Sequence, residues 1–193
     1  MKDPLQSEEN SKKEKKKKKK KKEASRSAET MFRTTLTNHI ELSSMADQKA
    51  GLMISVNSVV VSIMVSFMVN ELADNPRLIL PTCLLVVVSL LTITFSILAT
   101  KPSVKSVPKA EGQRIDLLFF GDYTLLSLDE YNNAMTKMLE SENTLRNQMI
   151  ASIYAQGAVL SRKYKLLKIA YTIFMFGFPL VVLVYFLALS GLF

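Results

Sequence analysis

Hydrophobic positions recur at alternating spacings of four and three residues through most of residues 32–69, the heptad spacing of a helix that packs along one seam. Residues 50–70 contain no charged side chain, and a helix of this length crosses about 30 Å of hydrocarbon. The pattern therefore predicts one long helix that begins in water and ends inside a bilayer. The seam positions are Phe32, Leu36, His39, Ser43, Ala46, Ala50, Met53, Asn57, Val60, Met64 and Phe67.

Small and polar residues on this seam indicate how it packs. Ser43, Ala46 and Ala50 let a partner helix approach closely, whereas the polar His39 and Asn57 fix its register. We interpret His39, the only histidine, as a packing residue rather than a catalyst. We expect subunits to assemble through the seam, which would carry a change from the water-exposed half of the helix into the membrane half.

Two further uncharged runs, residues 78–100 and 169–192, are also long enough to span a bilayer. The chain is therefore predicted to be an all-α membrane protein with three transmembrane helices, the first two forming a hairpin. Hydroxyl side chains at helical spacing either pack or hydrogen-bond across this hairpin or line a hydrated path. They are Ser55, Ser58, Ser62 and Ser66 on the first span, and Ser89, Thr92 and Ser96 on the second.

The segment between the second and third spans predicts a small helical domain. Ser127 and Glu130 have the spacing of a capping box at a helix start. The four-three spacing continues after them and is interrupted at Glu142, which predicts two helices joined near residues 141–143. The preceding apolar and aromatic patch, residues 115–126, is either a short strand or a docked loop.

Basic residues flank this segment and place it in the cytoplasm. They are Lys101, Lys105, Lys109, Arg162, Lys163, Lys165 and Lys168. The 71–77 loop contains one basic residue and lies outside, so the N-terminus is inside and the C-terminus outside. The expected organisation is a disordered lysine-rich tail (1–27), a cytosolic extension of the first helix (28–50), membrane helices at 51–69, 78–100 and 169–192, and a cytosolic helical domain (101–168).

Composition agrees with a membrane protein, because 48% of the residues are hydrophobic. The net charge of +8 comes mainly from eleven lysines within residues 1–22, so the rest of the chain predicts no nucleic-acid-binding face. The tail has too little apolar content to fold, and we interpret it as solvated. Its distance from the first span argues against a fixed contact with lipid headgroups.

Catalytic patterns are missing from the sequence. One histidine and one cysteine, Cys83, cannot build a metal cluster, and neither a glycine-rich phosphate loop nor a nucleophile with its own histidine is present. We therefore predict no enzymatic activity, no cofactor and no metal. The spans also lack the ionisable residues that mark an ion path, which argues against a transporter.

Several separated motifs resemble, in the same order, the transmembrane effector family of Pycsar anti-phage systems. They are NHIELSSMADQKA (38–50), ISVN (54–57), LFFGD (118–122), LDEY (128–131), IYAQG (153–157) and VLSRKY (159–164). The resemblance implies a bacterial inner-membrane effector, encoded with a pyrimidine cyclase, that impairs the membrane in response to cyclic CMP or cyclic UMP. Some relatives carry a His-Asp phosphohydrolase domain, but this chain lacks the histidines for it.

A cyclic nucleotide needs a cation for its phosphate and a stacking surface for its base. The candidate contacts are the cations Arg33, Lys49 and Arg114 and the aromatic residues Phe119 and Tyr123, which with Phe120 alternatively form a small hydrophobic core. The expected function is that of a multi-pass, homo-oligomeric effector that a cyclic pyrimidine nucleotide activates, causing abortive infection. The alternative is a non-enzymatic scaffold or accessory subunit that assembles through its seams and binds no nucleotide.

Overall fold

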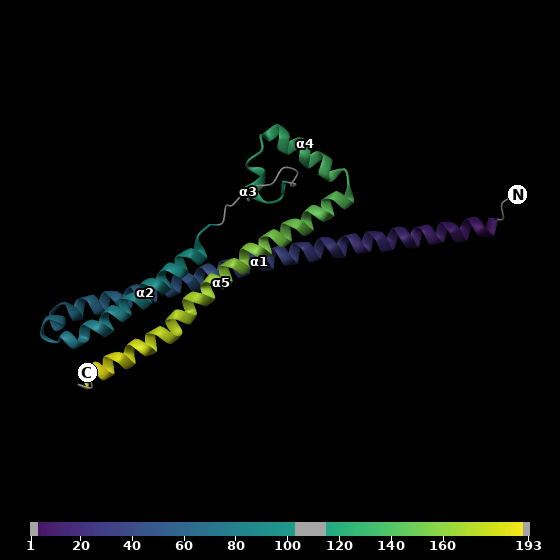
Figure 1. Cartoon of the computed structure of the whole chain (residues 1–193). Helices are drawn as coiled ribbons and strands as arrows, with labels where there is room; N and C mark the ends of the chain where they lie inside the picture. Colours follow the sequence, from purple (N-terminus) through teal and green to yellow (C-terminus); the bar gives the residue numbers. More distant parts are fainter. Residues whose placement is uncertain (1–3, 103–114, 191–193) are drawn as a thin grey trace.

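The computed structural model of the 193-residue chain describes residues 4–102 and 115–190, which contain helices and no strand. The elements are α1 (Pro4–Asp74), the 3-10 helix η1 (Pro76–Leu78), α2 (Ile79–Thr100), α3 (Phe120–Tyr123), α4 (Leu128–Leu139) and α5 (Glu142–Leu189). Among the described residues, three helices are long and apolar enough to cross a membrane, in α1, in η1 with α2, and in α5. The predicted all-α class with three spans is therefore confirmed (Figure 1).

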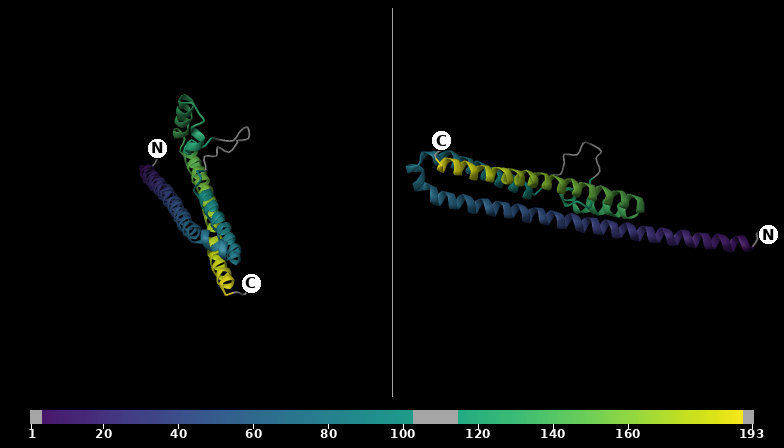
Figure 2. Two further views of the ribbon diagram at one scale, coloured as in Figure 1. Left: turned by 90° about the vertical axis from the view of Figure 1, so that its left-hand side faces the viewer. Right: turned by 90° about the horizontal axis from the view of Figure 1, so that it is seen from below.

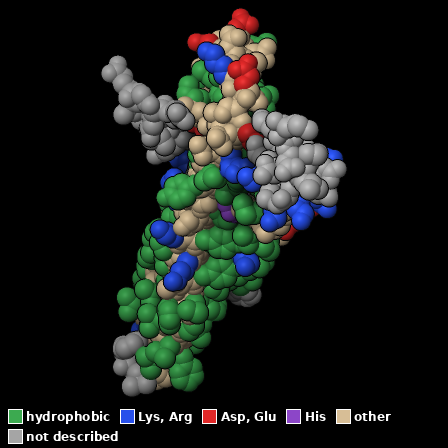
Figure 3. All heavy atoms as spheres, turned by 90° about the vertical axis from the view of Figure 1, so that its right-hand side faces the viewer, with side chains coloured by type: hydrophobic (Ala, Val, Ile, Leu, Met, Phe, Trp, Pro, Cys, Tyr) green, Lys and Arg blue, Asp and Glu red, His purple; other side chains and the backbone are tan. Residues whose placement is uncertain are grey.

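The three long helices meet where small side chains let them approach. Ala46 and Ala50 of α1, Ala99 of α2 and Leu167 of α5 form one buried cluster. A second buried cluster, further towards the α1–α2 hairpin, joins Leu85, Val88 and Val181. Each of the three helices therefore packs against the other two (Figure 2). Hydrophobic side chains cover much of the bundle surface, and acidic side chains gather at the other end of the molecule (Figure 3).

The heptad seam of α1 is the face that packs within this bundle. Phe32, Ala46, Ala50, Met53 and Asn57 are buried on it, and the seam positions between and beyond them whose side chains are described are partly buried. Helices α2 and α5 of the same chain occupy the seam. The expectation that subunits assemble through it is therefore corrected, because heptad spacing identifies a packing face without identifying its partner.

The two stripes of hydroxyl groups do not face each other. Ser89, Thr92 and Ser96 of α2 are buried, whereas the serines of α1 at positions 55, 58, 62 and 66 are exposed. Ser62 and Ser66 donate to the carbonyl oxygens of the residues four positions earlier, at 2.8 and 2.9 Å. Their hydroxyl groups are thus satisfied on α1 itself and need no partner across the hairpin.

The lysine-rich tail also differs from the prediction, since α1 is helical from Pro4 onward. Low apolar content predicts disorder for residues 1–27, but lysine and glutamate are strong helix formers. Extending a helix that packing has already nucleated costs little compared with starting a new one. This end of α1 extends beyond the other helices as an arm (Figures 1 and 2).

The predicted capping box at the start of α4 is confirmed. Glu130 N–H donates to Ser127 Oγ at 3.3 Å, and Ser127 N–H donates to Glu130 Oε2 at 2.9 Å. Ser141 caps the start of α5, which confirms the predicted joint between the two helices. Helix α5 then continues without interruption through Pro179 to Leu189.

Residues 115–126 form a docked loop with the short helix α3, and not a strand. Gln148 of α5 holds this loop, donating to Ile115 O at 3.3 Å and to Asp116 Oδ1 at 3.0 Å. A second aspartate, Asp122, accepts from Asp116 N–H at 3.1 Å. Phe119 of the same loop lies next to residues of α1 and α5.

Candidate functional site

A groove of about 640 Å³ lies between α1 and α5, beyond the end of α2 at Thr100. We call it the α1–α5 groove. Its lining consists of His39, Ile40, Ser43, Ser44, Asp47 and Gln48 from α1, Phe119 from the docked loop, and Gln156, Val159 and Leu160 from α5. The groove therefore combines polar side chains, apolar walls and one aromatic ring.

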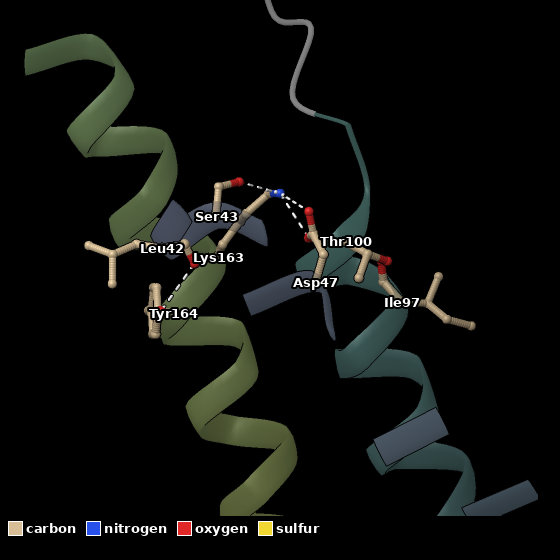
Figure 4. Close-up of polar contacts among 7 residues, drawn as sticks. All are labelled: Leu42, Ser43, Asp47, Ile97, Thr100, Lys163 and Tyr164. Atoms are coloured by element: carbon tan, nitrogen blue, oxygen red, sulfur yellow. Dashed lines mark hydrogen bonds and ion pairs between the residues drawn. The ribbon is translucent and has the colours of Figure 1, made fainter. Parts of the chain in front are cut away.

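An interhelical ion pair lies at the membrane-proximal end of this groove (Figure 4). Lys163 Nζ of α5 is 2.8 Å from Asp47 Oδ1 and 2.9 Å from Asp47 Oδ2, and it donates to Ser43 Oγ at 2.9 Å. Tyr164, the next residue, donates from its hydroxyl group to Leu42 O at 3.1 Å. Two consecutive residues of α5 thus anchor it to one turn of α1.

The local sequence accounts for this arrangement. Ser43 and Asp47 are four residues apart and therefore lie on the same face of α1. The Lys163 side chain is only 14% exposed, and its ammonium group donates hydrogen bonds to both of these residues. The carboxylate of Asp47 is 43% exposed, so this pair is sited at the edge of the groove and remains accessible from it.

His39 lies in the groove one turn from Ser43. Its Nδ1 atom is buried and has no hydrogen-bond partner among the described residues. A Cβ atom at Gly157 of α5 would lie 3.5 Å from His39 Cε1, so the imidazole packs closely against this part of α5. His39 therefore has an unpaired, buried ring nitrogen in addition to the packing role that the sequence predicts.

The structure brings together only some of the candidate nucleotide contacts. Phe119 lines the groove, whereas Arg33 and Lys49 are exposed on α1 and do not line it. Arg114 lies outside the described residues. None of the described residues that line the groove is a lysine or an arginine, but Lys163 contacts two of them, Ser43 and Asp47. The sequence indicated Lys163 only as one of the basic residues that set the topology and as part of the VLSRKY motif.

Tyr123 belongs to a different cluster. Its ring packs against Tyr131 of α4 with 5.2 Å between ring centroids and a tilt of 45°. This contact favours the hydrophobic-core interpretation for Tyr123. The seam residue Asn57 also lies away from the groove and is fully buried within the membrane bundle.

Sequence reasoning missed Lys163, Ser43 and Gln156 as members of one site. The signal was weak: Ser43 and Asp47 share a helix face, but nothing local indicates that Lys163, 116 residues after Asp47, lies opposite them. Gln156 is part of the IYAQG motif and was not distinguished from its neighbours.

One known protein family matches most of the chain. The Pycsar effector protein domain matches residues 30–190, which include the membrane bundle and both sides of the α1–α5 groove. Comparisons with curated proteins and with solved structures gave no match. Because the match extends over most of the chain and includes its three membrane-length helices, the chain belongs to the Pycsar effector family and is a membrane effector of anti-phage defence.

Proposed function

We propose that this effector is an inner-membrane protein gated by a cyclic pyrimidine nucleotide, cyclic CMP or cyclic UMP, which a functionally linked cyclase supplies. Binding takes place in the α1–α5 groove and leads to oligomerisation and loss of membrane integrity. The observation that carries this proposal is the position of the Lys163–Asp47 ion pair, between the groove and the cluster where α1, α2 and α5 meet.

The chemistry of the groove suits such a ligand. Its volume of about 640 Å³ falls within the usual range for small-molecule sites. Phe119 offers a stacking surface for a pyrimidine, and His39 and Gln156 offer polar atoms for the edge of the base. Lys163 offers the cation that a cyclic phosphate requires.

A phosphate that binds Lys163 would compete with Asp47 for the ammonium group. Ligand binding then favours the arrangement in which the Lys163–Asp47 pair is broken, and α5 becomes free to shift against α1. Because both helices continue into the membrane bundle, this shift reaches the spans directly. Contacts between subunits would use surfaces other than the α1 seam, which α2 and α5 occupy.

Calorimetric titration of the full chain in lipid nanodiscs tests this proposal. We expect heat of binding with cyclic CMP or cyclic UMP and none with cyclic AMP. Phe119→Leu should weaken binding about tenfold or more, because stacking on one aromatic ring contributes about 1–3 kcal/mol. The matched control Tyr154→Leu removes an exposed aromatic ring that does not line the groove and should leave binding unchanged.

Two variants of the ion pair separate binding from folding. Lys163→Met should abolish binding, whereas Asp47→Asn should preserve or strengthen it, because it breaks the same pair but leaves the ammonium group free for phosphate. Equal loss in both variants would mean that the pair only supports the fold. A folded parent protein that binds neither nucleotide would favour the scaffold or accessory-subunit function instead.

A further inference from the structure

A layer of polar side chains crosses the interior of the membrane bundle. Asn57 of α1 and Thr92 and Ser96 of α2 are each 0% exposed. The layer lies between the apolar cluster around Ala50 and the apolar cluster around Leu85. Along the bundle axis, this polar layer therefore has a hydrophobic cluster on each side.

The register of the two helices places these residues together. Ala50 and Ala99 share one cluster, and Met64 and Leu85 pack together in the other. Asn57 is seven residues from both Ala50 and Met64, and Thr92 is seven residues from both Ala99 and Leu85. Because α1 and α2 are antiparallel, Asn57 lies level with Thr92, and Ser96 lies about one turn away.

The hydrogen bonds in this layer are incomplete. Asn57 Nδ2 donates to Met53 O, and Thr92 Oγ1 donates to Val88 O, both at 2.8 Å. Asn57 Oδ1 and Ser96 Oγ have no partner among the described residues. An unpaired oxygen atom is unfavourable in a bilayer because hydrocarbon cannot replace the hydrogen bonds of water.

We propose that this layer is a binding site for one ordered water molecule. The water donates one hydrogen to Asn57 Oδ1 and the other to a lone pair of Thr92 Oγ1, and it accepts the hydrogen of the Ser96 hydroxyl group. One molecule therefore satisfies the two unpaired oxygen atoms and makes three hydrogen bonds, the usual number for buried water. The three side chains carry no formal charge, which favours water over a cation.

Solid-state NMR on the full chain in liposomes tests this site directly. The experiment measures magnetisation transfer from water to the side-chain amide of Asn57, recognised by its proximity to the Met53 carbonyl carbon. We expect transfer comparable to that at Asn75, which is exposed in the turn between α1 and η1. Absence of transfer at Asn57 would overturn the proposal, and a direct Ser96–Asn57 hydrogen bond would then explain the layer.

A double-mutant cycle provides a second measurement. With a shared water, the effects of Asn57→Leu and Ser96→Ala on the unfolding equilibrium should be coupled by about fivefold or more. The control pair is Asn57→Leu with Thr94→Ala, because the exposed Thr94 hydroxyl group bonds to Leu90 O on α2 itself. These effects should be additive. Additivity in both pairs would contradict a shared water, and stabilisation by sodium chloride but not by choline chloride would assign the site to a cation.

Discussion

Lys163 and Asp47 join α5 to α1 through an ion pair whose two partners differ in burial. The lysine side chain is 14% exposed and the aspartate side chain 43%, with 2.8 Å between Nζ and Oδ1. Removal of the aspartate leaves the less accessible charge without its counterion. Removal of the lysine leaves a carboxylate that water can still solvate.

Reversing this pair should restore what either single change removes. We expect Lys163→Asp and Asp47→Lys each to lower the stability of the bundle, by about 1 kcal/mol once solvent screening of the aspartate is considered. The double variant should recover most of this loss in thermal unfolding in detergent. The control Arg146→Met breaks the exposed Arg146–Glu142 pair within α5 and should have a smaller effect. A double variant less stable than both single variants would contradict a specific pair.

Gly177 of α5 permits close contact with α2 in the membrane bundle. A Cβ atom there would lie 2.7 Å from Val88 Cγ1, so Gly177→Ala should destabilise the bundle by about 1–3 kcal/mol through overpacking. Val88→Ala in the same chain should restore stability. In contrast, no atom lies within 4 Å of a Cβ atom at Gly51, so Gly51→Ala should be neutral or slightly stabilising in reversible unfolding in mixed micelles. Equal losses at the two glycines would refute the packing explanation.

The capping box of α4 predicts a dependence on pH. Hydrogen bonds from the backbone N–H and then the hydroxyl group of Ser127 lower the pKa of Glu130 below its ordinary value of 4.5. A lowered pKa means that the charged carboxylate stabilises the folded helix start above pH 4.5, and that this contribution is lost as the pH falls through the lowered pKa.

Hydrogen-exchange protection of residues 127–131 should therefore be constant above pH 4.5 and should decrease as the pH falls below that value and through the lowered pKa of Glu130. Glu130→Gln keeps an acceptor that does not titrate and should remove this decrease. Persistence of the decrease in Glu130→Gln would assign it to another group.

Orientation across the membrane remains a prediction from the distribution of basic residues. In a Cys83→Ser background, a cysteine at Arg77 should react with a membrane-impermeant thiol reagent on intact spheroplasts, and a cysteine at Lys137 should not. Both positions are exposed, so the comparison depends on the side of the membrane and not on burial. The reverse pattern would place the α1–α5 groove outside the cell and exclude a cytosolic nucleotide as its ligand.

Local patterns predicted much of this fold because they report directly on helix faces and ends. The heptad spacing identified the buried face of α1, and the spacing of Ser127 and Glu130 identified the start of α4. Local patterns could not identify contacts between residues that are distant in sequence. Lys163 belongs to a basic cluster that indicates topology equally well whether or not it faces Asp47.

Two other predictions failed because the same residue type is compatible with more than one local structure. The serines of the first span have the spacing of a packing stripe, but Ser62 and Ser66 bond to their own helix and remain exposed. The lysines of the tail indicate disorder by charge, but they also favour a helix once the adjoining segment is helical.

Because α1 is one continuous helix, a change of its tilt in the membrane also moves its N-terminal arm. From residue 50 to residue 4 the helix extends about 70 Å, at about 1.5 Å per residue. A tilt of about 10° at the membrane would move residue 4 by about 12 Å, and tilts of this size lie within the normal range for transmembrane helices. A small tilt of α1 within the membrane therefore becomes a large displacement near residue 4. The distance between two fluorophores, one of them attached near residue 4, would measure this displacement.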